Sequence, residues 1–224
     1  MKEFLIYFQF SIPSMLILPA SSDSIKQAAA IIRSGGTVAH ATETCYGLAC
    51  DLRNLDAVKK LFAIKQRPLH QPVSGLFSSV DEAKKWVIWN DRAGELGKQY
   101  LPGPLTLILP IRSDAPSKLF PIPESVILSV VEGQKQTLGV RISSHPLAMS
   151  LAIACGFPIS TTSANIHGQP NPYSVKDLLM QFGDKADQPD LILDSGILPQ
   201  NPPSTVIDCT KGELQTARKG DIAI

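Results

Sequence analysis

The order of hydrophobic and polar residues predicts that helices and strands alternate along most of the chain. Apolar residues recur at helical spacing from Ile25 to Ile32, after Ser22 or Asp23, either of which can cap a helix. A Gly-Gly pair follows, and the apolar run 37–41 after it has the length of a buried strand. The same criteria predict further helices near 54–67, 80–89, 91–100, 146–156 and 173–182. They predict further strands near 72–77, 105–111, 126–131, 138–142, 158–161, 190–194, 204–208 and 213–217.

The arrangement of these elements favours a single α/β domain. Strands and helices interleave, but two strand-rich stretches follow one another without helices, so a mixed sheet fits better than a purely parallel one. No internal repeat, low-complexity tract or linker divides the chain. We therefore expect one domain over residues 22–224, built on a twisted mixed sheet flanked by helices, after an N-terminal extension of residues 1–21.

The N-terminal extension has several interpretations, because residues 4–22 contain no charged side chain. Lys2 followed by an apolar stretch resembles a weak signal peptide. As a membrane span the segment is poor, since Pro13 and polar residues interrupt it and a span needs about 20 apolar residues. An ordered first strand is another interpretation, and a mis-assigned start with Met15 opening the domain is a third. We favour a cytoplasmic protein in which residues 1–14 are dispensable.

Composition excludes several classes of protein. The 224 residues are 44% hydrophobic and 18% charged, which is typical of a globular domain and not of a disordered chain. Lys and Arg number 21 and Asp and Glu number 20, and the resulting net charge of +1 argues against a general polyanion-binding surface but not against one anion-binding pocket. The four cysteines form no CxxC pair and have no His at a metal-binding spacing, so neither a zinc site nor a disulfide framework is expected.

Familiar nucleotide-binding and hydrolase motifs are absent, and the candidate chemistry lies in polar clusters at predicted strand or helix edges. Each cluster also has a structural interpretation. Lys65 and Arg67 follow a helix, where they either stabilise its negative end or bind phosphate. Arg141 interrupts an apolar strand, so it needs an internal carboxylate, a ligand or solvent. The clusters occupy residues 42–48, 65–68, 139–146, 160–168 and 203–208, the last followed by Arg218.

Taken in order, these clusters resemble one known family. The segments are HATETCYGLACD, KQRP, LPGPLTLIL, GVRISSHPL, STTSANIHGQP and PSTVID. They resemble the YrdC/TsaC family of threonylcarbamoyl-AMP synthases over residues 22–220, and the chain is similar to the short, single-domain type. The resemblance implies a catalytic domain over residues 22–224, with a mixed sheet around a concave, positively lined pocket. It also implies a nucleotidyltransferase, which converts L-threonine, bicarbonate and ATP to threonylcarbamoyl-adenylate and pyrophosphate.

The resemblance implies site residues as well. It places L-threonine against Thr44, Tyr46, Arg141, Thr161 and Ser204. It places ATP against Lys65, Arg67, Gln71, Thr137, Ser163, Asn165, Asn171 and Arg218. Lys65, Arg67 and Arg141 are then the catalytic cations, and no protein nucleophile is required if threonine carbamate itself attacks the α-phosphate. Mg2+ would be bound with ATP, and we expect no dedicated protein site for it.

Some positions depart from the family pattern. The proline that is common before the first motif threonine is Ala41 here, and another common proline is Thr162. Gln71 and Asn171 stand where asparagine and serine are frequent, and Leu76 stands where some longer members carry histidine. We expect these changes to leave the chemistry intact.

Two other functions stay open at this point. An RNA-binding module could use the same concave surface, although the net charge of +1 and the lack of interleaved aromatic and basic residues argue against it. A carbamoyl-adenylate domain of a carbamoyltransferase is the other alternative. Under the main interpretation the product passes to a tRNA-modifying threonylcarbamoyl transferase complex; direct weak RNA binding stays open, and no membrane partner is expected.

Two expectations concern individual segments. We expect Lys65→Ala and Arg67→Ala each to raise the ATP requirement without unfolding the protein, because both cations lie at a helix end. We also expect the residues after Gly220 to be dispensable, since the site that the resemblance implies ends at Arg218.

Overall fold

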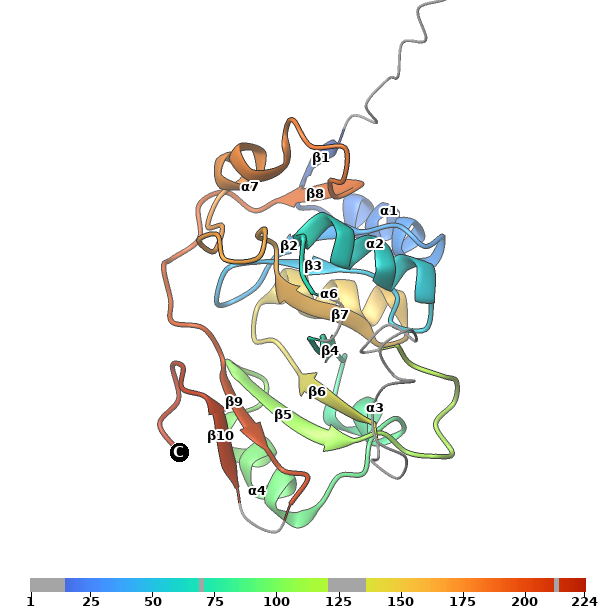
Figure 1. Ribbon diagram of the computed structural model, residues 1–224, viewed down its shortest axis with the longest axis vertical. Helices are drawn as coiled ribbons and strands as arrows, with labels where there is room; N and C mark the ends of the chain where they lie inside the picture. The colour runs from blue at the N-terminus through green and yellow to red at the C-terminus, as the bar shows by residue number, and fades with distance from the viewer. Residues whose placement is uncertain (1–14, 69–70, 121–135, 212–213) are drawn as a thin grey trace, which may run out of the picture.

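The computed structural model describes residues 15–68, 71–120, 136–211 and 214–224. Within these residues the chain forms a ten-stranded sheet with helices packed against it (Figure 1). The helices are α1 (Ser22–Arg33), α2 (Leu55–Lys65), α3 (Val80–Lys84), α4 (Asp91–Tyr100), α6 (Pro146–Cys155) and α7 (Val175–Phe182). The strands are β1 (Leu16–Pro19), β2 (Val38–Ala41), β3 (Tyr46–Ala49), β4 (Ser74–Leu76), β5 (Leu105–Pro110), β6 (Thr137–Arg141), β7 (Ile159–Ser163), β8 (Leu191–Asp194), β9 (Thr205–Asp208) and β10 (Gln215–Arg218). The strand predicted near 126–131 lies outside the described residues.

The sheet is mixed, which confirms the predicted fold class. Its strand order is β1-β8-β2-β3-β7-β4-β6-β5-β9-β10. The pairs β1·β8, β2·β8, β4·β6 and β5·β9 are parallel, and the other neighbouring pairs are antiparallel. β7 pairs with β3 on one side and with β4 on the other. It therefore joins the upper part of the sheet in Figure 1 to the lower part.

Helices cover the sheet through faces that the periodicity predicted. α1 begins with a capping box between Ser21 and Ser24, so the cap precedes by one or two residues the position that we expected. Its buried apolar face packs against α6 and β8. α6 ends at Gly156, whose φ of 73° is a backbone conformation that glycine adopts at little cost. In Figure 1, α2 lies in front of the sheet, and α1 and α6 lie behind it.

Two segments differ from the sequence-based expectation. Tyr46–Ala49 forms the strand β3, whereas the sequence predicted no strand within the polar cluster 42–48. Thr42 closes the connecting turn, since its Oγ1 donates to Cys45 O at 2.7 Å, and β3 then runs antiparallel to β2. The helix predicted near 80–89 ends at Lys84. Val87 forms an isolated β-bridge with Ile111, so packing beside the end of β5 stops the helix early.

The sheet begins before the predicted domain boundary. β1 pairs in parallel with β8 from Leu16 opposite Leu191 to Pro19 opposite Asp194. The boundary that we placed after residue 21 is therefore wrong for residues 16–19, which belong to the sheet. Residues 1–14 lie outside the described part of the chain. No helix in the described part of the chain is long and apolar enough to cross a membrane.

The edge strand β1 yields a test of where the fold begins. A chain that begins at Met15 should have the melting temperature of the full chain. A chain that begins at Ser21 should unfold at a lower temperature. Its free energy of unfolding should be smaller by about 2 kcal/mol, because it lacks the β1 hydrogen bonds, each worth ~1 kcal/mol net. These include Leu16 N to Asp190 O and Ala20 N to Asp194 O. Thermal unfolding measured by circular dichroism compares the three chains, and equal stability of the two truncated chains would contradict this prediction.

Candidate functional site

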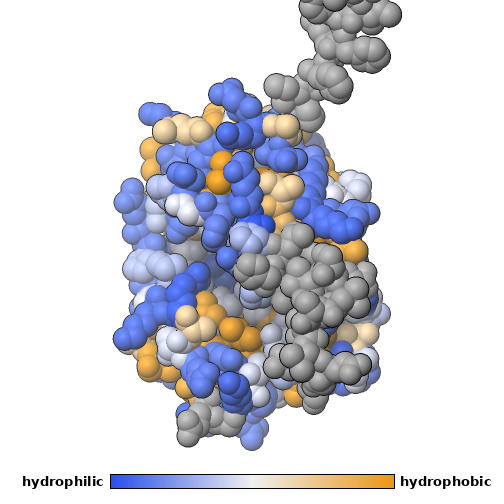
Figure 2. Space-filling model, in the orientation of Figure 1, coloured by the Kyte–Doolittle hydropathy of each residue, from blue (hydrophilic) through white to orange (hydrophobic). Residues whose placement is uncertain are grey.

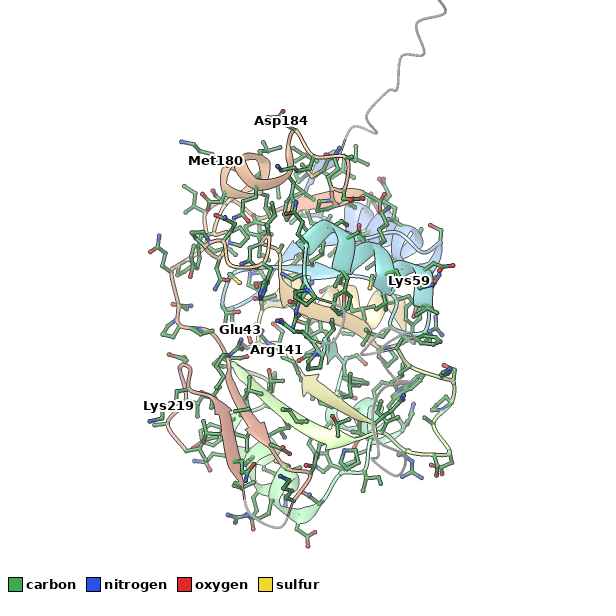
Figure 3. The ribbon with its side chains drawn as sticks, viewed as in Figure 1. Glu43, Lys59, Arg141, Met180, Asp184 and Lys219 are labelled. Carbon is green, nitrogen blue, oxygen red and sulfur yellow. The ribbon has the colours of Figure 1, made fainter. Side chains whose placement is uncertain are left out.

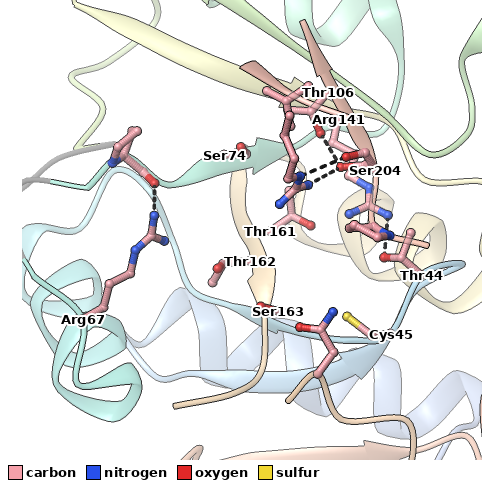
Figure 4. A pocket seen from close by; sticks show the side chains of 15 residues that line it. Thr44, Cys45, Arg67, Ser74, Thr106, Arg141, Thr161, Thr162, Ser163 and Ser204 are labelled. Carbon is pink, nitrogen blue, oxygen red and sulfur yellow. Dashed lines mark hydrogen bonds between the residues drawn. The ribbon is translucent and has the colours of Figure 1, made fainter. Parts of the chain in front are cut away.

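A cavity of about 220 Å³ lies between the upper and lower parts of the sheet. Figure 2 shows the molecule hollowed on this side, and Figure 4 shows the lining side chains. Three arginines line the cavity, whereas no Asp or Glu does so in the part of the chain that the structure describes. Hydroxyl groups make up most of the remaining polar lining. The lining residues are Thr44, Cys45, Arg67, Pro72, Ser74, Thr106, Arg141, Thr161, Thr162, Ser163, Asn171, Pro203, Ser204, Val206 and Arg218.

Arg141, at the end of β6, is held in the cavity wall by a buried ion pair with Glu43. Its Nη2 donates to Glu43 Oε1 and to Thr44 Oγ1, both at 3.0 Å. Figure 3 shows Glu43 and Arg141 together near the middle of the molecule. Burial raises the pKa of Glu43, but the charge of Arg141 and a hydrogen bond from Ser143 outweigh it, so the pKa lies below its ordinary value. Glu43 is therefore ionised at neutral pH and offsets part of the Arg141 charge.

Of the three partners that the sequence left open for Arg141, the structure shows the internal carboxylate. The side chain has an internal carboxylate, and it also lines the cavity. Its Nε is buried and has no hydrogen-bond partner among the described residues. A buried donor without an acceptor costs about 1–3 kcal/mol, which favours an acceptor supplied by a ligand.

Arg218 reaches the cavity from the edge of the sheet and contacts Ser204. Its Nε donates to Ser204 O at 3.0 Å and its Nη2 donates to Ser204 Oγ at 2.8 Å. Ser204 Oγ also lies 3.0 Å from Thr106 Oγ1. Burial, followed by the charge of Arg141, lowers the pKa of Arg218. The two cations repel each other, so an anion between them would stabilise this side of the cavity.

Arg67 enters from the end of α2. Gln66, with a left-handed φ of 47°, ends the helix and turns the chain, so that Arg67 lies on the cavity side. The Arg67 Nε donates to Gln71 Oε1 and its Nη2 donates to Pro72 O, both at 2.8 Å. These two bonds fix the plane of the guanidinium and leave its other N–H groups for a ligand. Gln71 supports Arg67 and does not itself line the cavity.

Lys65 is buried beside the cavity, and protein oxygens surround its ammonium group. The Nζ donates to Ser163 O, to Asn165 O at 2.9 Å and to Asn165 Oδ1 at 3.2 Å. Ser163 Oγ donates to the same Asn165 Oδ1 at 2.6 Å. Burial, followed by the nearby charge of Arg67, lowers the pKa of Lys65 to about 7. Because three acceptors match the three N–H groups, Lys65 organises the loop after β7, and a direct contact with phosphate stays a prediction.

The structure brings most of the expected residues together. Eight of them line the cavity: Thr44, Arg67, Arg141, Thr161, Ser163, Asn171, Ser204 and Arg218. Five do not line it in the described residues: Tyr46, Lys65, Gln71, Thr137 and Asn165.

Tyr46 and Thr137 differ most from their expected places. Tyr46 is fully buried, its hydroxyl donates to Gly196 O at 2.9 Å, and it accepts from Ser195 N at 2.9 Å. It therefore anchors the segment after β8 and is not among the described residues that line the cavity. Thr137 begins β6, opposite Pro110, at the end of the strand remote from Arg141. An extended strand of this length carries the two residues about 13 Å apart, so Thr137 lies away from the cavity.

The sequence-based reasoning missed several lining residues, most clearly Cys45, Ser74 and Thr106. Thr106 lies opposite Arg141 in the β5·β6 register and contacts Ser204. A hydroxyl inside the apolar run LTLIL was the available signal, because a buried hydroxyl needs a partner. Ser74 and Cys45 carried no such signal. All four cysteines are buried and free. Among the described residues, no three or more His, Cys, Asp or Glu side chains gather as metal ligands.

Comparison with known proteins assigns the family. A family model named Sua5/YciO/YrdC, with the description telomere recombination, matches residues 30–220. The chain belongs to the Sua5/YciO/YrdC family. This confirms the resemblance that the ordered polar clusters carried.

Two relatives of this Sua5/YciO/YrdC chain are named for the same activity. A Vibrio cholerae protein named threonylcarbamoyl-AMP synthase is 32% identical over 201 residues, which are 88% of this chain and 98% of that protein. A Bacillus subtilis protein of the same name is 32% identical over 206 residues, which are 92% of this chain and 56% of that protein. The structure of P. abyssi Sua5 complexed with L-threonine has a TM-score of 0.76 and 31% identity, and the match covers 92% of this chain and 57% of that one. This chain thus spans little more than half the length of the latter two.

The Lys65 network yields a stability prediction. Lys65→Met should lower the free energy of unfolding by about 1–3 kcal/mol, because it removes the donor that Ser163 O, Asn165 O and Asn165 Oδ1 share. From the sequence we expected that loss of Lys65 would not unfold the protein, at the small cost of losing a cation at a helix end. The contacts of Lys65 predict a larger cost. Lys59→Met is the matched control, since Lys59 lies on the same helix with a side chain 55% exposed. Urea unfolding measures both variants, and equal midpoints would show that the Lys65 contacts do not stabilise the fold.

His40 yields a pH prediction. It is fully buried in β2, its Nδ1 lies 3.1 Å from Ala41 O, and burial lowers its pKa to about 4. In the unfolded chain the pKa of His40 is near 6.5, so below this pH the unfolded state binds a proton that the folded state does not bind. The stability that neutral His40 allows above pH 6.5 is therefore lost as the pH falls toward 4. In the parent, stability should fall by about 3 kcal/mol more over this range than in His40→Gln. Urea unfolding at pH 7 and pH 4.5 tests this, and parallel pH profiles would refute it.

Proposed function

We propose that this chain is a threonylcarbamoyl-AMP synthase. It condenses L-threonine, bicarbonate or CO2, and ATP to threonylcarbamoyl-adenylate and pyrophosphate. The observation that carries the proposal is a cavity lined by three arginines and a group of hydroxyls, in a chain related over most of its length to proteins of that name. Arginines suit the ATP phosphates, and hydroxyls suit the polar groups of threonine.

The proposed mechanism relies on positioning and charge. The neutral amine of threonine adds to CO2 and loses one proton to water, which gives a carbamate. A carbamate oxygen then attacks the α-phosphorus of ATP, and the bond from phosphorus to the departing pyrophosphate breaks. Arg67 and Arg218 hold the phosphates, and Arg141 binds the carboxylate of threonine through the N–H groups that Glu43 and Thr44 leave free. Lys65 keeps Ser163 and Asn165 in place through the contacts described above. Removal of water and fixed orientation of the two reactants then supply the catalysis.

A magnesium ion would be bound mainly by ATP. Glu43 is the acidic residue nearest to Arg141 in this network, and it already accepts from Arg141 and Ser143. The lining supplies hydroxyl and amide oxygens, which fit a Mg2+ ion that keeps most of its ligands from phosphate and water. The ion would neutralise the departing pyrophosphate.

The wider role follows from the product. Threonylcarbamoyl-adenylate is an activated acyl donor, and we propose that a tRNA-modifying threonylcarbamoyl transferase complex in the cytoplasm consumes it, for the adenosine beside the anticodon. The RNA-binding alternative gains no support from the names of the relatives. Release of pyrophosphate without any RNA would separate the two functions.

The direct test is pyrophosphate release from ATP with and without each substrate. We expect release that requires both L-threonine and bicarbonate, and a product whose mass is that of threonylcarbamoyl-adenylate. Release that is independent of threonine, or no release at all, would refute the proposed function.

Side-chain selectivity follows from the hydroxyl lining. Threonine should be a far better substrate than valine, and serine should lie between them. The hydroxyls of Thr44, Thr161 and Ser204 can pair with a substrate hydroxyl, and a buried polar site rejects an analogue that lacks the hydroxyl more strongly than one that lacks a methyl group. Values of kcat/KM for the three amino acids measure this, and similar values for threonine and valine would contradict the assigned lining.

The phosphate contact of Arg67 is testable separately. Arg67→Ala should raise the KM for ATP by roughly tenfold or more, the range for a charged hydrogen bond, and should leave the melting temperature nearly unchanged. Lys59→Ala is the control, because it removes an exposed cation from α2 (Lys59 is labelled in Figure 3). An unchanged KM for ATP in Arg67→Ala would exclude Arg67 from the nucleotide site.

A further inference from the structure

We infer that Thr205 and the C-terminal residues 220–222 form a clamp that positions Ser204 and Arg218 in the cavity. None of the clamp residues lines the cavity in the described part of the chain. They act as positioning residues through the two side chains that do. The effect on activity rests on the proposed function, whereas the clamp itself can be tested without any substrate.

Side chains alternate between the two faces of the sheet at residues 204–206. Ser204 and Val206 line the cavity, and Thr205 between them points to the other face, where it is 1% exposed. A hydroxyl buried on that face needs partners, and the chain end supplies them. Thr205 Oγ1 donates to Ile222 O at 2.7 Å and accepts from Ile222 N at 3.0 Å and from Gly220 N at 3.2 Å.

Backbone contacts complete the clamp. Asp221 N donates to Pro203 O at 3.1 Å. A Cβ atom on Gly220 would lie 2.1 Å from Pro203 O and 2.5 Å from the carbonyl carbon of Ser204. The two chain segments are therefore in van der Waals contact at a position where only glycine fits. These contacts fix the backbone immediately before and after Ser204.

The same clamp fixes Arg218. β10 carries one extra residue between Thr216 and Arg218, so that Arg218 lies opposite Val206. Without this bulge, Ala217 would lie opposite Val206 and Arg218 would point to the other face. The clamp begins two residues after Arg218, and Arg218 in turn holds Ser204 by two hydrogen bonds. The segment around Ser204 thus contacts both the Arg218 side chain and the residues that follow β10.

This arrangement argues against the expectation that residues after Gly220 are dispensable. Asp221 and Ile222 supply hydrogen bonds to Pro203 and Thr205. Ala223 and Ile224 have no part in the clamp. The two halves of the C-terminal tail should therefore differ in their effect.

Four variants test the clamp. Thr205→Val removes the hydroxyl and keeps the shape, and Thr205→Ser keeps the hydroxyl. A chain that ends at Gly220 loses the clamp residues 221 and 222, and a chain that ends at Ala223 keeps them. Amide hydrogen exchange of residues 203–206 and 215–218 is measured for each, together with kcat and the KM for threonine and ATP.

We expect the four variants to behave as two pairs, one that loses the clamp and one that keeps it. Thr205→Val and the chain ending at Gly220 should exchange faster in both segments and should raise the KM values by about three- to tenfold, with a smaller change in kcat, the loss expected for one or two hydrogen bonds. Thr205→Ser and the chain ending at Ala223 should match the parent. Exchange and KM values equal to the parent in the first pair would overturn the clamp, as would Thr205→Ser behaving like Thr205→Val. If the parent releases no pyrophosphate, the proposed function fails, and the exchange rates alone still confirm or overturn the clamp.

Discussion

The buried ion pair between Arg141 and Glu43 is the interaction on which the site depends. A guanidinium inside an apolar strand is costly unless a carboxylate and further acceptors surround it. Glu43 lies in the turn between β2 and β3, in the upper part of the sheet, whereas Arg141 ends β6 in the lower part. The pair therefore links the two parts across the cavity. It also leaves one buried donor, Nε, without a protein acceptor among the described residues, which suits a ligand.

The cavity is positively charged although the chain as a whole is nearly neutral. The net charge is +1, yet Arg67, Arg141 and Arg218 all line one small cavity. Each guanidinium is fixed by a protein oxygen: Gln71 and Pro72 hold Arg67, Glu43 holds Arg141, and Ser204 holds Arg218. A cation that is already oriented loses little conformational freedom when it binds phosphate. Under the proposed function, these strand and helix ends would bind the phosphates that a glycine-rich loop binds in many nucleotide-binding proteins.

The segment between β8 and β9 joins the same network. Tyr46 holds its beginning at Ser195 and Gly196. Asn201 Nδ2 then donates to Glu43 O at 2.8 Å, so the backbone of the ion-pair residue anchors the segment as well. The segment ends at Ser204, in the cavity wall. Tyr46, which we expected beside the substrate, thus contacts the beginning of the segment that ends at Ser204.

The local sequence pattern determined the helices and strands, and the kind of partner that a buried polar side chain needs. The periodicity placed α4 at Asp91–Tyr100, and the mixture of helices and successive strands indicated a mixed sheet. The lone charge in an apolar strand showed that Arg141 needs a partner. Six short segments in order carried the resemblance to the family.

Only the tertiary structure decided the partners. Arg141 and Glu43 are 98 residues apart, Lys65 and Asn165 are 100 apart, and Tyr46 and Gly196 are 150 apart. Several polar residues could have been the hydrogen-bond partner of each of these side chains. The order and register of the strands brought one of them within reach. The bulge in β10 decided that Arg218 faces the cavity, although its strand is exposed along its length. Hydrophobic periodicity specifies which face of an element is buried, but the pairing of buried polar groups depends on distances between elements that local sequence does not encode.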